Sequence, residues 1–262
     1  MGFTLAIAQP PGDLGLPEAR LGWLRDHLAT LPATDLLLLP ELFHCGYNIG
    51  DALPQRAEPR DGPFARAMAD LARQHGVALA YGYAEAAEGR LYNSAQCLDK
   101  SGQPIGHHRK LTLPPGYEAD HFTRGADLSQ FTLGGLTCGF LICYDVEFPE
   151  NTRAQAMAGC DLILVPTALG ADWGVVSRHL IPTRAFENGA YVAYADHAGA
   201  QNGHGYFGGS VIADPWGTPL ARAAQTPDLI RATLDPAQVA EARARLPYLR
   251  DRAALPSVTS TP

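Results

Sequence analysis

The sequence predicts an α/β domain in which sheets are covered by helices. Strand-like and helix-like segments alternate along all 262 residues, an order that is typical of this fold class. Hydrophobic residues make up 46% of the chain and charged residues 18%, enough apolar material for a substantial core and too little charge for disorder. Because no low-complexity linker or internal repeat interrupts the series, we expect a single domain over residues 1–262.

The first third of the chain alternates strands with two helices. Residues 4–9 and 35–39 are short apolar runs that predict strands, the second one rich in leucine. Residues 17–31 carry leucine at every third or fourth position, which is the spacing of one helical face. Residues 64–75 predict a second helix, and a strand at 77–83 follows it.

The middle of the chain contains two predicted hairpins. Strands at residues 91–98 and 104–108 flank the turn 99–102, whose Asp, Ser and Gly suit a tight turn. Two glycines at 134–135 predict a second hairpin, which leads into a strand that ends at Cys143.

The last part of the chain returns to an alternating order. A helix is expected at residues 151–158, and the elements after it are a strand at 161–166, a helix at 175–188, strands at 191–196, 209–213 and 229–234, and a helix at 236–246. From residue 247 to residue 262 the sequence has little pattern, and we expect an extended tail there.

Charge and motif content exclude several classes of function. The net charge is −7, and no basic cluster exceeds the run 107–110, so nucleic-acid binding has no electrostatic support. The N-terminus lacks the pattern of a signal peptide, and no apolar run approaches the roughly 18 residues of a membrane helix. The five cysteines include no Cys-x-x-Cys pair, and the nine histidines lack helical metal-ligand spacing. We therefore expect no metal, no cofactor, no membrane or nucleic-acid partner, and a cytoplasmic protein.

Cys143 stands between an apolar run and a polar turn that precedes a helix-like stretch. A side chain at the end of a buried strand, just before a helix N-terminus, is held rigidly and faces backbone N–H groups. Such a cysteine can act as a nucleophile beside an oxyanion site. The alternative is that Cys143 is a small buried hydrophobic residue without a chemical role.

Two further strand ends carry ionisable side chains. Glu41 follows the leucine-rich strand, and burial there would raise the pKa of its carboxyl group and make it a competent base toward a thiol. Lys110 follows the strand 104–108, and a fixed ammonium there can stabilise an oxyanion. Taken singly, Glu41 also fits a turn or capping residue, and Lys110 fits a solvated surface lysine.

The order and spacing of these segments closely resemble the nitrilase superfamily of carbon–nitrogen hydrolases. The resemblance spans nearly the whole chain and rests on Pro-Glu at 40–41, Arg-Lys-Leu at 109–111, Cys-Tyr-Asp and Phe-Pro-Glu within 143–150, Gln9, Tyr-Asn-Ser at 92–94, and Arg-Ala-Phe-Glu-Asn at 184–188. The fold that it implies is a four-layer α-β-β-α sandwich. It also implies a homodimer or higher homo-oligomer, to whose interface the tail from residue 247 would contribute.

The resemblance assigns a catalytic set. It implies that Glu41 is the general base, Lys110 the electrostatic stabiliser and Cys143 the nucleophile that forms a thioester. The oxyanion would be held by Lys110 and the backbone N–H of Tyr144. Glu118 matches a second family glutamate that positions the lysine and the substrate, although a surface glutamate would look the same in sequence.

The residues around the cysteine also bear on the substrate. Carbamoyl amino-acid hydrolases and omega-amidases of the superfamily tend to carry arginine three or four positions after the cysteine, where this chain has valine and Glu147. An anionic substrate therefore lacks its obvious partner. Glu147 suits a cationic or neutral substrate, or it is a glutamate favoured by a helix N-terminus. Tyr47 and Trp173 match positions that line the family's pocket, although core aromatic residues would look alike.

The resemblance is greatest to bacterial amidases of the 5-aminopentanamidase and R-stereoselective amidase type, which release ammonia from small carboxamides that often bear an amine. It implies an amidase, with 5-aminopentanamide as the leading substrate. One alternative is hydrolysis of a cationic N-carbamoyl amine such as N-carbamoylputrescine. Another is a catalytically silent binding protein on the same scaffold, against which the complete catalytic set argues. A papain-like Cys–His hydrolase would need a local cysteine signature that this chain lacks.

Overall fold

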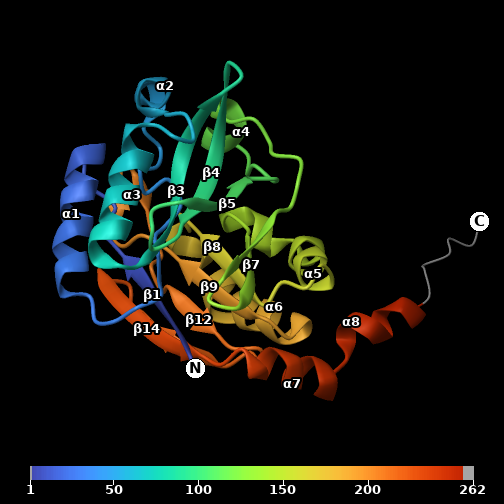
Figure 1. Ribbon diagram of the computed structural model, residues 1–262. Coiled ribbons are helices and arrows are strands. Elements are labelled where there is room, and N and C mark those ends of the chain that lie inside the picture. The colour runs from blue at the N-terminus through green and yellow to red at the C-terminus, as the bar shows by residue number, and fades with distance from the viewer. Residues whose placement is uncertain (1, 256–262) are drawn as a thin grey trace, which may run out of the picture.

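Two six-stranded sheets, packed face to face, form the centre of the molecule (Figure 1). The computed structural model describes residues 2–255. In spatial order the first sheet contains β14 (Asp228–Leu234), β1 (Phe3–Gln9), β2 (Leu36–Leu38), β3 (Ala78–Ala87), β4 (Arg90–Leu98) and β5 (Pro104–Arg109). The second contains β13 (Pro219–Arg222), β12 (Val211–Ala213), β9 (Tyr191–Ala195), β8 (Leu162–Pro166), β7 (Leu136–Phe140) and β6 (Gln130–Leu133).

Each sheet has a parallel centre and antiparallel edges. Strands β1, β2 and β3 pair in parallel, as do β7, β8 and β9. All residues of β2 and β8 are buried, as expected for parallel strands that are covered on both faces. The two predicted hairpins are confirmed, because β4 pairs with β5 and β6 pairs with β7 in antiparallel register.

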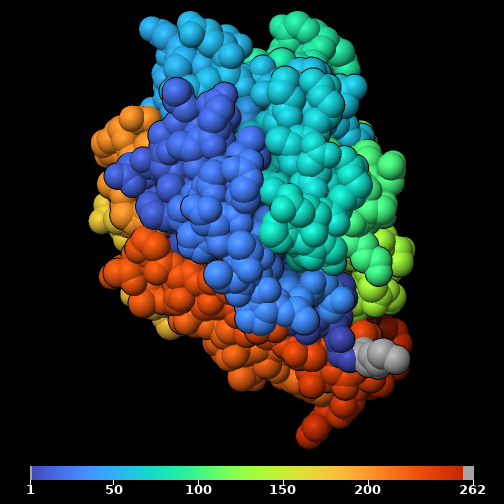
Figure 2. All heavy atoms as spheres, turned by 60° about the vertical axis from the view of Figure 1, so that its left-hand side comes forward, coloured from blue at the N-terminus to red at the C-terminus, as the bar shows by residue number. Residues whose placement is uncertain are grey.

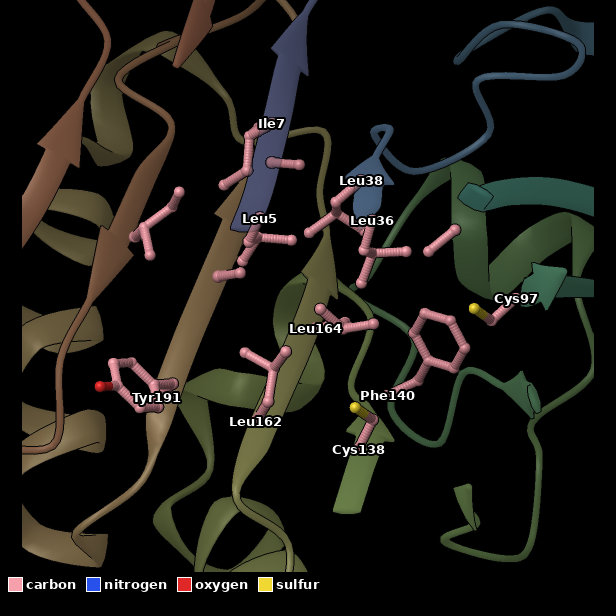
Figure 3. Packing of buried hydrophobic residues seen from close by; sticks show 14 of the residues in the cluster. Leu5, Ile7, Leu36, Leu38, Cys97, Cys138, Phe140, Leu162, Leu164 and Tyr191 are labelled. Atoms are coloured by element: carbon pink, nitrogen blue, oxygen red, sulfur yellow. The ribbon is translucent and has the colours of Figure 1, made fainter. Parts of the chain in front are cut away.

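Apolar side chains from both sheets fill the layer between them (Figure 3). Alternate residues of a strand point to opposite faces of its sheet. In β1, Leu5 and Ile7 therefore pack against the second sheet, whereas Ala6 and Ala8 pack toward the outer helices. From the second sheet, Phe140 and the β8 leucines enter the same layer.

Helices cover both outer faces of the sandwich. Helices α1 (Pro17–Thr30) and α3 (Pro63–His75) lie side by side over the first sheet (Figure 2). Helices α5 (Pro149–Met157) and α6 (Ile181–Asn188) contact each other on the second sheet's side. The layer order is α-β-β-α, which confirms the expected four-layer fold.

Two expected elements in the second half of the chain have different boundaries. The strand β7 ends at Phe140, and Cys143 instead begins a 3₁₀-helix, Cys143–Glu147. The expected helix at 175–188 consists of a π-helical turn, Val176–Leu180, followed by α6. The break coincides with a proline in the first turn of α6, which has no N–H to donate to the preceding turn.

The extended tail expected from residue 247 is corrected in part. After α7 (Ala237–Arg245) the chain forms α8 (Tyr248–Asp251) and a 3₁₀ turn, Arg252–Ala254. Helix α8 projects beyond the sheets (Figure 1) and contacts α5 and α6, where the Tyr248 ring packs on Phe186. The apolar contact of Tyr248 with Phe186 explains why this segment is helical and not extended. The rest of the expected tail, residues 256–262, lies outside the described part of the chain.

Short elements complete the connections between the layers. They are a 3₁₀ turn (Gly50–Ala52), α2 (Leu53–Arg56), α4 (Tyr117–His121), a 3₁₀ turn (Ala171–Trp173) and the hairpin of β10 (Ala200–Gln201) with β11 (His204–Gly205). Within residues 2–255, no helix is both long enough and apolar enough to span a membrane.

Candidate active site

Glu41 sits in a tight turn after β2, and its side chain is fully buried. The next residue, Leu42, has a φ of 49°. Gly82 of β3 packs against this turn so closely that a Cβ there would lie 2.6 Å from the Glu41 Cα and 2.5 Å from the Leu42 nitrogen. The Glu41 carbonyl oxygen accepts a hydrogen bond from His197 Nε2 at 2.8 Å. Contacts from distant segments therefore fix the position of this carboxylate.

Lys110 directly follows β5 and is also fully buried. Its Nζ lies 2.7 Å from Glu41 Oε1 and 2.7 and 2.6 Å from the two oxygens of Glu118. Asn93 Nδ2 donates to Glu41 Oε1 at 2.6 Å and to Glu118 Oε2 at 3.0 Å. The hydroxyl of Tyr47 donates to Glu118 Oε1 at 2.9 Å. One ammonium is thus held between two carboxylates.

The two oxygens of Glu41 differ in their surroundings. Oε1 accepts the hydrogen bonds from Lys110 and Asn93. Oε2 is buried, and no group within residues 2–255 donates a hydrogen bond to it. Buried carboxylate oxygens are normally hydrogen-bonded, so this oxygen is available to accept a proton.

Cys143 is the first residue of its 3₁₀-helix and has a φ of 45°, in the left-handed region that a non-glycine residue rarely adopts. Strain of this kind is of the order of 1–3 kcal/mol and tends to occur at functional sites. Burial raises the pKa of the Cys143 thiol well above its usual value, Glu41 raises it further, and Lys110 opposes them. The thiol is therefore protonated at neutral pH and needs a base to become a nucleophile.

Burial also sets the charge state of Glu41 and Lys110. It raises the pKa of Glu41 to about 7 despite the opposing charge of Lys110, and Glu118 adds to the increase. Burial lowers the pKa of Lys110, but the attraction of Glu118 and Glu41 outweighs it and leaves that pKa well above its usual value. The lysine is therefore charged at neutral pH, where Glu41 can both accept and release a proton.

Asp145 joins the turn that carries the cysteine to the loop that carries the lysine. Its buried carboxylate accepts hydrogen bonds from the backbone N–H of Ile142 at 3.1 Å, of Leu111 at 3.1 Å and of Thr112 at 2.8 Å. The Thr112 hydroxyl adds a fourth at 2.6 Å. One side chain therefore holds the two loops in a common geometry.

A cavity of about 660 Å³ opens beside Cys143. The five side chains expected to contact substrate all line it, namely Tyr47, Glu118, Tyr144, Glu147 and Trp173. Trp173 is 64% exposed, so it is no core aromatic residue. Glu118 and Lys110 are not surface residues either, because both are buried in the ion cluster. The structure therefore brings every predicted site residue together.

The cavity wall contains acidic side chains and no basic one among the described residues apart from a histidine, His204. Burial lowers the pKa of His204, which keeps it neutral near pH 7. Glu147 is partly buried, which raises its pKa, while Lys110 and Arg184 oppose this shift. Within residues 2–255 its carboxylate forms no ion pair. Such a wall suits neutral or cationic ligands better than anions.

Sequence reasoning missed several residues that support this site. Asn93 and Asp145 lie within the Tyr-Asn-Ser and Cys-Tyr-Asp motifs, which mark their neighbourhood in the sequence. Only the fold shows that Asn93 donates to Glu41 and that Asp145 accepts from the backbone of Leu111. Gly82 and His197 gave no signal, because each reaches Glu41 only through the folded chain.

Comparison with known proteins identifies the family. The chain matches the carbon–nitrogen hydrolase family over residues 4–244. It belongs to that family. This carbon–nitrogen hydrolase is 44% identical over 233 residues to a hydrolase of the pqqF 5′ region of Pseudomonas protegens. The alignment covers 87% of this chain and 82% of that protein. It is 35% identical over 220 residues to an (R)-stereoselective amidase of a Pseudomonas species, with 84% of this chain and 80% of that protein covered.

Solved structures agree with these sequence matches. A variant of the amidase from Nesterenkonia sp. AN1, in complex with acrylamide, superposes with a TM-score of 0.85 at 32% identity over 97% of this chain and 95% of that one. A further variant of the same amidase was solved in complex with butyramide. The predicted membership of the nitrilase superfamily is confirmed, and the protein is an amide-hydrolysing enzyme.

Proposed function

We propose that this enzyme hydrolyses small neutral or amine-bearing carboxamides to a carboxylate and ammonia, with 5-aminopentanamide as the leading substrate. The observation that carries the proposal is the buried cluster of Glu41, Lys110 and Glu118, next to a cysteine that lines a cavity without lysine or arginine among its described lining residues. The acrylamide and butyramide complexes of the Nesterenkonia amidase support short aliphatic amides. For an amine-bearing amide, Glu147 supplies the negative partner.

In the proposed reaction, Glu41 Oε2 accepts the proton of the Cys143 thiol while the sulfur attacks the amide carbon. The carbonyl oxygen becomes an oxyanion, which Lys110 and the backbone N–H of Tyr144 stabilise. Glu41 then returns the proton to the departing amine, and ammonia leaves behind a thioester. Water attacks the thioester and gives its proton to the same carboxylate. The carboxylic acid departs, and the thiol is restored.

A pKa of about 7 for Glu41 suits this double role. A base whose pKa lies near the working pH accepts and returns a proton with little driving force lost in either direction. Glu118 is engaged by Lys110, Asn93 and Tyr47, so it serves to position the lysine.

A second candidate function is hydrolysis of a cationic N-carbamoyl amine. The acidic side chain of Glu147 favours it as much as it favours an amine-bearing amide, because the two substrates share the cationic end. Only the carbamoyl reaction releases carbon dioxide together with ammonia, so measuring both gases separates the candidates.

The test is an ammonia-release screen over small amides, N-carbamoyl amines and nitriles, with Cys143→Ala as the control. We expect turnover of amides, no turnover by Cys143→Ala, and an unchanged circular dichroism spectrum for that variant. Mass spectrometry of the wild-type enzyme should show an acyl adduct on Cys143, which a catalytically silent binding protein would never form. Substantial turnover by Cys143→Ala would disprove the mechanism.

We also propose a homo-oligomer in the cytoplasm. Exposed apolar side chains on α6, α5 and α8, namely Phe186, Met157 and Tyr248, support an interface on this face. The five cysteines are free and buried, which fits a reducing compartment. Size-exclusion chromatography that gives only a monomer of 28.0 kDa would contradict the oligomer.

A further inference from the structure

A second cavity, of about 560 Å³, lies on the first sheet at the β4–β5 edge. Four arginines line it: Arg60 before α3, Arg90 at the start of β4, Arg109 at the end of β5 and Arg124 after α4. None of the proposed catalytic or substrate-contacting residues does so. Because the chain as a whole carries a net charge of −7, a concave cluster of arginines needs a local explanation.

The acidic residue at the base of the cavity is already neutralised. Glu85 is nearly fully buried, and its oxygens accept hydrogen bonds from Arg109 Nη2 at 2.7 Å and from His107 Nε2 at 2.9 Å. Burial raises the pKa of Glu85, but the hydrogen bonds of His107 and Arg109 outweigh it and hold that pKa well below its usual value. Arg109 is fixed in place, with its guanidinium 3.8 Å from the centre of the Tyr92 ring.

The other three arginines retain their positive charge without a carboxylate partner. Within residues 2–255, Arg60, Arg90 and Arg124 have no carboxylate within 4.0 Å, and Asp127 is the remaining acid in the cavity wall. His108, the neighbour of Arg109 in β5, points to the opposite face of the sheet, where its Nε2 lies 3.2 Å from Asp145 Oδ2, so the arginines alone give this cavity its charge.

We propose that this cavity binds a small dianion, either a phosphate group or a dicarboxylate. Its volume lies within the range of small-molecule sites. Guanidinium groups recognise carboxylate and phosphate oxygens through paired N–H donors. The excess positive charge relative to Asp127 favours an anionic ligand over a cationic one.

The cavity wall is also the backbone segment that carries Lys110. Arg124 Nε donates to the carbonyl oxygen of Leu111 at 2.6 Å, and the Gly125 N–H donates to that of Lys110 at 2.7 Å. In Figure 1 the chain after α4 accordingly passes beside β5. An anion bound by the terminal nitrogens of Arg124 leaves the hydrogen bond from Nε to the Leu111 carbonyl oxygen in place. Its negative charge also offsets the repulsion among the arginines. Its binding therefore stabilises residues 107–112.

Calorimetric titration with inorganic phosphate and with succinate, at constant ionic strength, tests the site. We expect saturable binding of at least one anion to the wild-type enzyme. Arg60→Gln/Arg90→Gln should bind it about tenfold more weakly, since two of the cationic partners of the anion are removed. The control Arg25→Gln/Lys100→Gln removes two exposed cations elsewhere and should bind within about twofold of wild type.

Each outcome decides a point. Binding of phosphate alone identifies a phosphate site, and binding of succinate alone identifies a dicarboxylate site. Absence of saturable binding for both anions, or equal affinity in Arg60→Gln/Arg90→Gln and wild type, overturns the proposal. Amide hydrogen exchange of residues 107–112 should slow when the anion binds, and unchanged exchange would refute the coupling to this segment. Neither readout depends on the substrate of the enzyme, so the proposed function can fail separately.

Discussion

Replacement of Glu41 by glutamine tests the reasoning about the active site most directly. Glutamine keeps the shape of the side chain and an oxygen that can accept hydrogen bonds from Lys110 and Asn93. It removes the one function that the geometry assigns to Oε2, which is acceptance of the thiol proton. Lys110 keeps Glu118 as its partner in the variant, so its charge is still balanced.

The structure sets the size of two effects. Loss of a general base lowers the rate by about 100- to 10,000-fold. Burial also raises the pKa of Glu41 from 4.5 to about 7, so its folded state favours the protonated form. This contribution to stability is fully present below the unfolded pKa and is lost as pH rises through the folded pKa. Ionisation of Glu41 therefore destabilises the folded enzyme by about 3 kcal/mol at high pH.

Ammonia release as a function of pH and thermal unfolding provide the assays. For the wild-type enzyme, kcat/KM should rise with pH through about 7, because the ionised carboxylate is the active form. The Glu41→Gln variant should lose most of this activity, and its melting temperature relative to wild type should increase between about pH 5 and about pH 8. Glu241→Gln, on the exposed face of α7, is the matched control.

Two results would refute this account. One is a kcat/KM of Glu41→Gln within about tenfold of wild type, because a base of this kind contributes more than that. The other is an acidic limb at the ordinary carboxyl pKa of about 4.3, because burial would then have no effect on Glu41.

Three further substitutions test the surroundings of the site. Glu147→Gln should lower kcat/KM for 5-aminopentanamide about tenfold and change it less than about twofold for butyramide. Equal losses for the two amides in the ammonia assay would contradict an ionic contact with the substrate amine. Asp145→Asn loses an acceptor for several backbone donors, so urea unfolding should show a stability loss of about 2–4 kcal/mol with a fall in kcat. Gly82→Ala should destabilise the fold by about 1–3 kcal/mol and reduce kcat. The control is Gly22→Ala, whose added Cβ has no atom within 4 Å and should cause neither effect. Unfolding curves that are similar for the two variants would argue against a crowded Glu41 turn.

Much of the fold could be predicted because local patterns have local causes. The leucine spacing of α1 and the turn residues of the β4–β5 hairpin depend on nearby positions alone. The boundary at Cys143 was less predictable. The apolar run continues to Ile142, but the strand ends at Phe140. The Asp145 carboxylate accepts hydrogen bonds from the backbone N–H groups of Ile142 and of Leu111, in the loop after β5, and these hold the backbone on a different path.

The sequence by itself determined the chemical class of this enzyme, because a glutamate, a lysine and a cysteine in the segments that follow three strands occur in the order of one family of hydrolases. Only the tertiary structure decided how the two glutamates differ. Glu41 and Lys110 are 69 residues apart, whereas Glu118 is 8 residues from the same lysine. Glu118 has both oxygens engaged and Glu41 has one oxygen without a donor in the described chain. Burial, which comes only with the folded chain, then gives Glu41 a pKa suited to proton transfer.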